Sequence, residues 1–251
     1  SVSAGTEYAG GLVGWVDGNT NINSSYNTGS VSTGDSGAGG LVGGMNSNAN
    51  ITSSYNTGQV SGVDQIGGLM GQGYGNIYAS FNSGAISGSA SPFGTGGLIG
   101  NAGATTISNA YNTGAITATG TDIGGLIGGK RGDHVFVENS YNAGVMSVTG
   151  DFSGLVSPAH PFIATSVYTN QVASSSGLTS YSATALADMK ELTLYSGWDF
   201  DTIWGFGSCS DNNGLPMLRQ LAQVGTYFGY SCGLDAAPAR NPVASNPAVY
   251  E

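Results

Sequence analysis

The sequence predicts an all-β fold, a β-solenoid of about six 28–29-residue coils followed by a small C-terminal capping module. A Gly-Gly-Leu-x-Gly box recurs at residues 10–14, 39–43, 67–71, 96–100 and 124–128, and a degenerate copy follows at 153–156. A second motif, Ser-Tyr-Asn-Thr-Gly or a close variant, follows each complete box. The box returns every 28 or 29 residues, and a fixed period of that size is typical of stacked-repeat proteins.

Aligned repeats give columns of similar residues. One column holds the leucines of the box: Leu12, Leu41, Leu69, Leu98, Leu126 and Leu155. A second holds the aromatic residues of the second motif: Tyr26, Tyr55, Phe81, Tyr111 and Tyr141. Short apolar segments between Gly, Asn and Ser indicate strands and turns rather than helices, about three strands per coil. One coil cannot bury its apolar side chains alone. Coils stacked at about 4.8 Å per rung would share one core of aliphatic and aromatic ladders.

Asparagine forms an unbroken column directly after the aromatic one: Asn27, Asn56, Asn82, Asn112 and Asn142. Asn before Thr-Gly favours a left-handed turn with local side-chain capping, and stacked Asn side chains can bond from rung to rung. A structural ladder is the predicted role, with ligand binding as the alternative. The glycines are expected to mark corners, where a side chain would clash or φ must be positive.

Composition excludes several functions. Only 8% of the residues are charged, the net charge is −10, and five residues are basic, so the electrostatic pattern of a nucleic-acid-binding protein is absent. No apolar run approaches the roughly 20 residues that span a bilayer, so membrane insertion is not expected. Residues 1–14 match residues 30–43, so the chain opens in mid-repeat, and we expect a mature or excised product.

The two cysteines, Cys209 and Cys232, form no CxxC pair, and both histidines lie far away in the sequence. Zinc is therefore not expected. We predict instead a disulfide between them, which would place the chain outside the cytosol, secreted or at the cell surface.

The combined pattern G-G-L-[VIM]-G…I-x-x-S-Y-N-T-G resembles the GLUG repeat of large bacterial surface and secreted proteins. These include adhesins of the filamentous-haemagglutinin type and non-catalytic regions of some IgA-cleaving peptidases. The resemblance covers roughly residues 1–175, and residues 186–221 resemble a W-D-F-x-x-x-W…N-G-x-P-x-L module that often closes such arrays. It implies an extracellular β-solenoid with an adhesive or structural role and no catalytic residues.

Three segments are expected. Residues 1–175 form the repeats, residues 176–234 a disulfide-tied cap with a short helix over 182–190, and residues 235–251 an extended linker or assembly arm. The arm ends in Pro247, Ala248, Val249 and Tyr250, which could pair with an exposed strand edge in a neighbouring copy. Head-to-tail contacts of that kind build filaments when they do not close.

No nucleophile, metal-protease or phosphate-loop motif is present, so we predict no enzyme, no cofactor and no metal site. The alternative function is a carbohydrate-binding or carbohydrate-cleaving β-helix, with Asp199 and Asp201 beside the tryptophans as its groove. Three weaker signals stay open. They are a loose acidic column for calcium (Glu7, Asp35, Asp64, Asp122 and Asp151), an Arg-Gly-Asp tripeptide at 131–133, and glycosylation sequons at Asn23 and Asn50.

The sequence therefore predicts an extracellular structural or adhesive protein, a cell-surface or filament-forming subunit. Its expected partner is its own copies, joined head to tail. Glycans or proteins of a host or another surface are the other partners considered.

Overall fold

The computed structural model describes residues 1–91, 93–131, 134–157, 162–171, 184–207 and 211–221. The chain divides into two compact units, Ser1–Leu186 and Ala187–Glu251. The predicted boundaries at 175/176 and 234/235 both fall outside the described residues, so they stay predictions.

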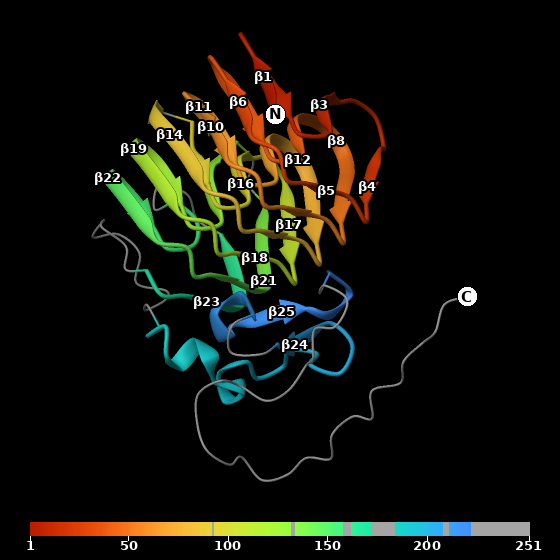
Figure 1. Ribbon diagram of the computed structural model, residues 1–251, viewed down its shortest axis with the longest axis vertical. Helices are drawn as coiled ribbons and strands as arrows, with labels where there is room; N and C mark the ends of the chain where they lie inside the picture. Colours follow the sequence, from red (N-terminus) through yellow and green to blue (C-terminus); the bar gives the residue numbers. More distant parts are fainter. Residues whose placement is uncertain (92, 132–133, 158–161, 172–183, 208–210, 222–251) are drawn as a thin grey trace. The chain divides into compact units, whose positions relative to one another are not determined.

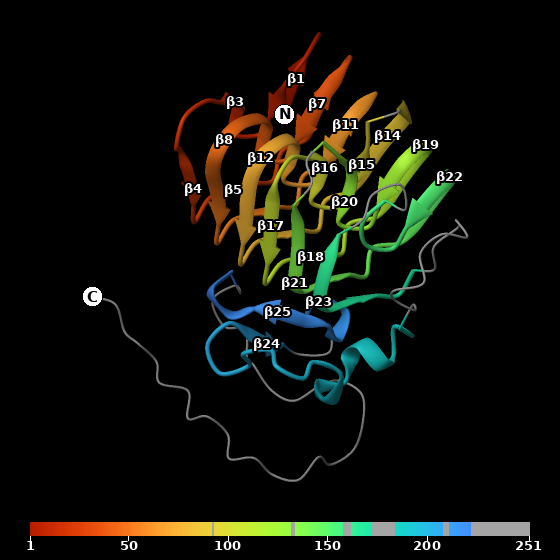
Figure 2. The same cartoon turned by 180° about the vertical axis from the view of Figure 1, so that it is seen from behind.

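The first unit is a parallel β-solenoid of about five turns, slightly fewer than the six predicted coils. Figures 1 and 2 show successive coils stacked side by side from the N-terminal strands to the green strands β22 and β23. Each strand pairs with its equivalent one repeat away, as in Val2 with Val31 and Val31 with Val60. This register is the direct result of a fixed sequence period, because equal spacing keeps like residues opposite one another.

The strands of the solenoid fall into five series. The series that follows the Asn turn comprises β1 (Val2–Ala4), β6 (Val31–Thr33), β10 (Val60–Gly62), β14 (Ile86–Ser91), β19 (Ile116–Gly124) and β22 (Met146–Ser153). The series that leads into the box comprises β2 (Ala9–Gly10), β7 (Ser36–Gly39), β11 (Asp64–Gly67) and β15 (Thr95–Gly96). These two series form a ten-stranded sheet, and in β19 and β22 they merge into one long strand.

The other three series form a thirteen-stranded sheet. Strands that leave the box are β3 (Val13–Val16), β8 (Val42–Thr52), β12 (Met70–Tyr78), β16 (Ile99–Ala102) and β20 (Ile127–Lys130). Next come β4 (Asn21–Asn23), β17 (Thr105–Ser108), β21 (Val135–Asn142) and β23 (Ile163–Thr169). The aromatic series comprises β5 (Tyr26–Asn27), β9 (Tyr55–Asn56), β13 (Phe81–Asn82) and β18 (Tyr111–Asn112).

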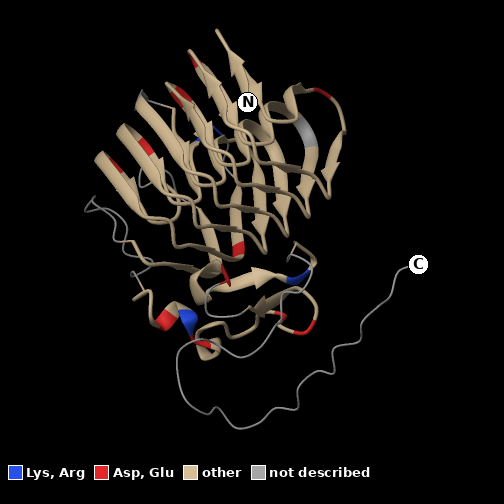
Figure 3. Ribbon diagram, in the orientation of Figure 1, with Lys and Arg blue, Asp and Glu red and all other residues tan. Residues whose placement is uncertain are grey.

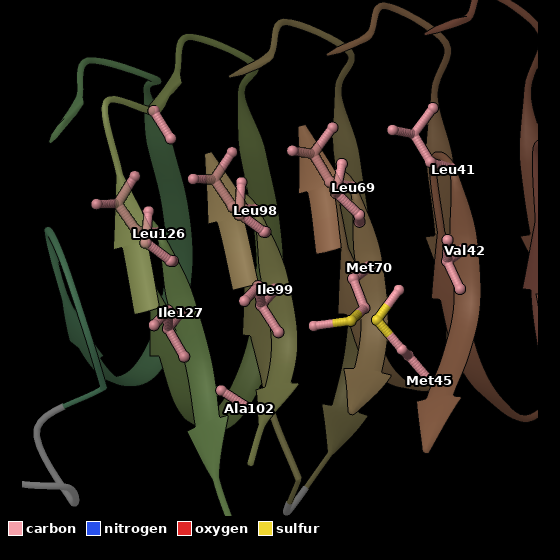
Figure 4. Close-up of a cluster of buried hydrophobic side chains, with 14 of the residues drawn as sticks. Leu41, Val42, Met45, Leu69, Met70, Leu98, Ile99, Ala102, Leu126 and Ile127 are labelled. Atoms are coloured by element: carbon pink, nitrogen blue, oxygen red, sulfur yellow. The ribbon is translucent and has the colours of Figure 1, made fainter. Parts of the chain in front are cut away.

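Aliphatic ladders fill the interior of the solenoid. Figure 4 shows the box leucines Leu41, Leu69, Leu98 and Leu126 in one row, with the residue after each leucine beside it. All four leucines are 0% exposed, and burying such a side chain contributes about 1.5–3 kcal/mol. A second, smaller cluster lies along the other sheet and includes Val60, Ile66, Ile86 and Ile116. The core is thus continuous from coil to coil, as stacking requires.

The described residues of the second unit form short elements. These are the 3-10 turns η1 (Asp188–Lys190), η2 (Leu192–Leu194), η3 (Asp211–Gly214) and η4 (Arg219–Leu221), and the antiparallel strands β24 (Trp204–Phe206) and β25 (Pro216–Leu218). The short helix expected over 182–190 is reduced to η1 in its described part, because Glu191 turns to an extended backbone at φ −95°, ψ 126°. Nowhere in the described chain is a helix long and apolar enough for a membrane span.

Candidate functional surface

The five aromatic rings of the repeat stack into a ladder along the solenoid. Ring centroids of successive members, from Tyr26 to Tyr141, lie 5.2, 5.0, 4.8 and 5.0 Å apart, and the planes diverge by only 1–7°. Parallel strands in register place identical positions one rung apart, so the rings meet face to face. Such ring pairs contribute about 0.5–1.5 kcal/mol each beyond the burial of their area.

The ladder lies on the outer face of its strands, and not within the shared core as expected. Ser54 and Asn56, the neighbours of Tyr55, are both 0% exposed, and adjacent residues of a strand point to opposite faces. Tyr26 is 58% exposed, and Tyr55 and Phe81 are half-buried. Tyr111 and Tyr141 are buried at 2% and 0%, and burial raises the pKa of the Tyr111 phenol.

The Asn column forms a second ladder, on the inner side of the same strands. Each side-chain Nδ2 donates to the Oδ1 of the next Asn at 2.8–2.9 Å, from Asn27 through to Asn142. The Oδ1 also accepts from the glycine two residues later at 3.1–3.2 Å. Asn56, Asn82, Asn112 and Asn142 are 0% exposed. These buried amides are acceptable inside the solenoid because their donors and acceptors find partners. The expected left-handed backbone is absent, since no residue of the column has a positive φ.

The first two glycines of each box make room for close neighbours. A Cβ on the first glycine, such as Gly39, would lie 1.8–2.0 Å from the carbonyl oxygen three residues later. A Cβ on the second, such as Gly40, would lie 1.9–2.2 Å from the next coil's backbone and 2.4 Å from Cγ of Asn56. The box and the Asn ladder are therefore parts of one packing arrangement, although they are some 16 residues apart in the sequence.

The last glycine of the box lets the two sheets touch backbone to backbone. A Cβ on Gly43, Gly71, Gly100 or Gly128 would lie 2.4–2.9 Å from a peptide of the preceding coil. The left-handed corners that glycine was expected to supply are instead occupied mainly by other residues. One such series runs Tyr8, Gly37, Gln65, Gly94 and Asp122, and another runs Ser24, Ser53, Ala79, Asn109, Asn139 and Ser166.

A polar cluster that the sequence did not reveal lies at the first of these corners. The Tyr8 ring packs against Trp15 at 4.5 Å, and its hydroxyl accepts a 2.6 Å hydrogen bond from Nε2 of Gln72. Gln72 and Asn101, opposite each other on adjacent rungs, are 5% and 2% exposed. Among the described residues, their side-chain oxygens have no hydrogen-bond partner. Trp15 is 42% exposed, so an aromatic surface adjoins a row of amides.

The first coil has an uncovered face. Val2, Leu12 and Tyr26 are 39%, 45% and 58% exposed, whereas their equivalents Val31 and Leu41 in the next coil are 1% and 0% exposed. In the described chain, Asn27 Oδ1 accepts from Gly29 alone, while Asn56 Oδ1 accepts from both Gly58 and Asn27. At the other end Thr169 replaces Asn, and its Oγ1 accepts from the backbone of Gln171 at 3.1 Å.

The structure does not bring the candidate carboxylates together as a groove. Asp199 accepts from the backbone nitrogens of Asp201 and Thr202 at 2.9 and 2.8 Å, and from the Thr202 hydroxyl. These bonds, led by those from Thr202, lower the pKa of the Asp199 carboxyl. Asp199 thus holds a turn before β24, while Trp204 is 0% and Trp198 is 7% exposed. Asp201 is exposed.

The acidic column follows one edge of the solenoid, as the red positions in Figure 3 indicate. Asp35 and Asp151 are exposed, Asp64 is half-buried, and Asp122 accepts a 2.8 Å bond from the Ser157 hydroxyl. Among the described residues no three His, Cys, Asp or Glu side chains gather closely enough to hold a metal ion.

Several predicted features fall outside the described residues. These are Cys209 and Cys232, the terminal Pro247, Ala248, Val249 and Tyr250, and Gly132 and Asp133 of the Arg-Gly-Asp tripeptide. The disulfide and the assembly arm therefore remain predictions.

The stacked coils and their two ladders define a tandem-repeat protein of the parallel β-solenoid class. Within that class, the family comparison matches the GLUG motif to residues 91–117, a stretch that spans one box and the aromatic strand around Tyr111. The match is consistent with a GLUG-repeat protein and agrees with the resemblance seen in the sequence. The comparisons with curated proteins and with solved structures returned no match to this chain.

Proposed function

We propose that the protein is an extracellular structural or adhesive component, a cell-surface or filament subunit that assembles end to end and performs no catalysis. The in-register stacking of the coils is the observation that carries the proposal, because each coil offers a strand edge on which the next coil pairs. Exposed strand edges of this kind are templates for pairing with another chain.

The ladders support a mechanical role. Aliphatic, aromatic and amide columns all run along the direction in which coils are added, so each coil is held by contacts to its neighbours. In such repeat proteins stability is a sum of coil and interface terms. A rod of this kind resists local opening, which suits a protein that spans a distance or bears a load outside the cell.

Electron microscopy of the purified full chain tests the proposal, with and without a reducing agent. We expect fibres with an axial repeat near the length of one subunit. Leu12→Glu places a charge on the uncovered face and should abolish them. Val63→Glu is the matched control, because Val63 is similarly exposed (41%, against 45% for Leu12) but lies away from the first coil. Isolated rods at every concentration, or equal effects of both variants, would contradict end-to-end assembly.

Saccharide binding is the second candidate, and it is supported by the exposed Trp15 ring, which packs against Tyr8. An exposed aromatic ring suits the apolar face of a sugar ring. A glycan array probed with the full chain and with Trp15→Ala tests it. Binding that is lost in the variant supports this candidate. Binding that persists in the variant would place the saccharide site away from Trp15.

A further inference from the structure

The aromatic ladder contains two pairs of adjacent tyrosines, Tyr26–Tyr55 and Tyr111–Tyr141, separated by Phe81. Both pairs are stacked, with ring centroids 5.2 and 5.0 Å apart. They differ in access to solvent. Tyr26 is 58% exposed and Tyr55 is half-buried, whereas Tyr111 and Tyr141 are 2% and 0% exposed. One pair is therefore open to a reagent in solution, and the other is closed.

We propose that Tyr26 and Tyr55 form an oxidative cross-linking site, at which a haem peroxidase with hydrogen peroxide joins the two rings as dityrosine. The proposal rests on ring geometry and exposure alone and is independent of the proposed function.

The chemistry needs two phenols side by side and one oxidant. Each phenol gives up one electron to the oxidant and its hydroxyl proton to water, which leaves two tyrosyl radicals. The radicals couple through the ring carbons ortho to the oxygens, forming one carbon–carbon bond. The two hydrogens displaced from these carbons then restore the phenolic hydroxyls. The net change is the loss of two hydrogen atoms from the protein, and hydrogen peroxide is reduced to two waters.

Neighbouring residues confine the reaction to this pair. Phe81, the next ring after Tyr55, lacks the hydroxyl that forms a tyrosyl radical, so the phenol series stops there. At the closed pair, burial raises the pKa of Tyr111, which opposes loss of the proton that oxidation releases. Register already places Tyr26 and Tyr55 one rung apart, so coupling requires the two side chains to turn until their ortho carbons meet, with no change of strand pairing.

The product would tie the first coil covalently to the second across 29 residues of chain. A covalent link restricts the unfolded chain and so favours the folded state.

The test is peroxidase treatment of the full chain at low concentration, followed by mass spectrometry of the intact protein and of its digest. We expect a monomer lighter by two hydrogens, dityrosine fluorescence, and one cross-linked peptide joining residues 26 and 55. Tyr26→Phe keeps the ring stack and should lose the product. Tyr74→Phe, which removes an exposed tyrosine (43%) outside the ladder, should keep it.

A gain-of-function variant controls for loss of the dityrosine product through misfolding of Tyr26→Phe. Phe81→Tyr supplies a phenol on the far side of Tyr55 and should add a second product joining residues 55 and 81. A cross-link spread evenly over other tyrosines, or one that survives Tyr26→Phe, would overturn the proposal. So would a product dominated by Tyr26 of one copy joined to Tyr26 of another.

Discussion

At the scale of single residues, the box glycines are required for space rather than for backbone conformation. The box glycines have ordinary φ values, yet a Cβ at any of the complete boxes' first or second positions would overlap a carbonyl oxygen. Among the described residues, positive φ values fall on eleven non-glycine residues and on eight glycines, and none of these glycines belongs to a box. Close backbone approach between sheets is thus what distinguishes these coils, and the box is the sequence feature that permits it.

We expect Gly100→Ala to destabilise the solenoid by about 1–3 kcal/mol, the usual cost of overpacking a tight site. The new Cβ would lie 2.4–2.5 Å from backbone atoms of Gln65, Gly71 and Ile66, none of which can move freely. Gly5→Ala is the control, since nothing lies within 4 Å of its Cβ position. Denaturant melts of both variants measure the difference. Equal stability of the two would argue against backbone contact between the sheets.

A buried amide ladder should not tolerate a carboxylate. In Asn82→Asp the Nδ2 that donates to Gly84 and Asn112 at 2.8 Å is replaced by an acceptor. We expect a loss of at least about 1–3 kcal/mol at neutral pH, because two buried acceptor oxygens lose a donated hydrogen bond and face a carboxylate oxygen instead.

The loss in this variant should depend on pH. Burial raises the pKa of the new carboxyl in the folded state, so the deficit is smallest below the ordinary Asp value of about 4 and grows as pH rises. Denaturant melts from below about pH 4 to neutral pH test whether the stability deficit grows as pH rises. Asn21→Asp is the control, because Asn21 is exposed and its Oδ1 already acts only as an acceptor for Asn50.

At the scale of elements, the sequence predicted about three strands per coil, whereas the structure has five strand series. It did predict the one-repeat register and the leucine and asparagine columns. The register and the columns follow from the repeat period and the residue types, which the sequence shows directly. The outward direction of the aromatic ladder was missed, because apolar residues are expected inside and Asn outside. Asn56 reverses that order because its four hydrogen bonds satisfy it when buried. The contact of Tyr8 with Gln72 joins residues 64 apart and leaves no local signal.

The turn before β24 should be sensitive to acid. Hydrogen bonds from Thr202 and Asp201 lower the pKa of Asp199 in the folded state. Its stabilising effect is therefore complete above the unfolded value of about 3.9 and is lost as pH falls through the lowered folded value. We expect Asp199→Ala to reduce this acid sensitivity. Tryptophan fluorescence of the full chain during acid titration measures the effect. Asp188→Ala, at an exposed carboxylate in η1, should leave it unchanged.

At the scale of the whole molecule, the same repeat unit recurs along the solenoid, but the first and last coils differ from those between them. The Asn column begins with Asn27, which has a spare acceptor position, and passes into Thr169, which caps its own turn. The Leu column likewise runs from a 45% exposed Leu12 to a 0% exposed Leu155.

The predicted disulfide between Cys209 and Cys232 is a property of the intact chain. We expect both cysteines to resist alkylation in the native and the denatured protein, and to react only after reduction. Intact mass after alkylation, with and without a reducing agent, counts the modified thiols. Labelling of both cysteines in the unreduced, denatured chain would remove the main argument for an oxidising compartment.

The asparagine ladder also gives the solenoid a direction. Every amide in it points the same way, with its nitrogen toward the following coil and its oxygen toward the preceding one. Aligned amide dipoles of this kind strengthen one another along a chain. Two first coils placed against each other would bring oxygen against oxygen, with no hydrogen between them. The two ends of the solenoid are therefore not equivalent, and the proposed end-to-end polymer would have a head and a tail.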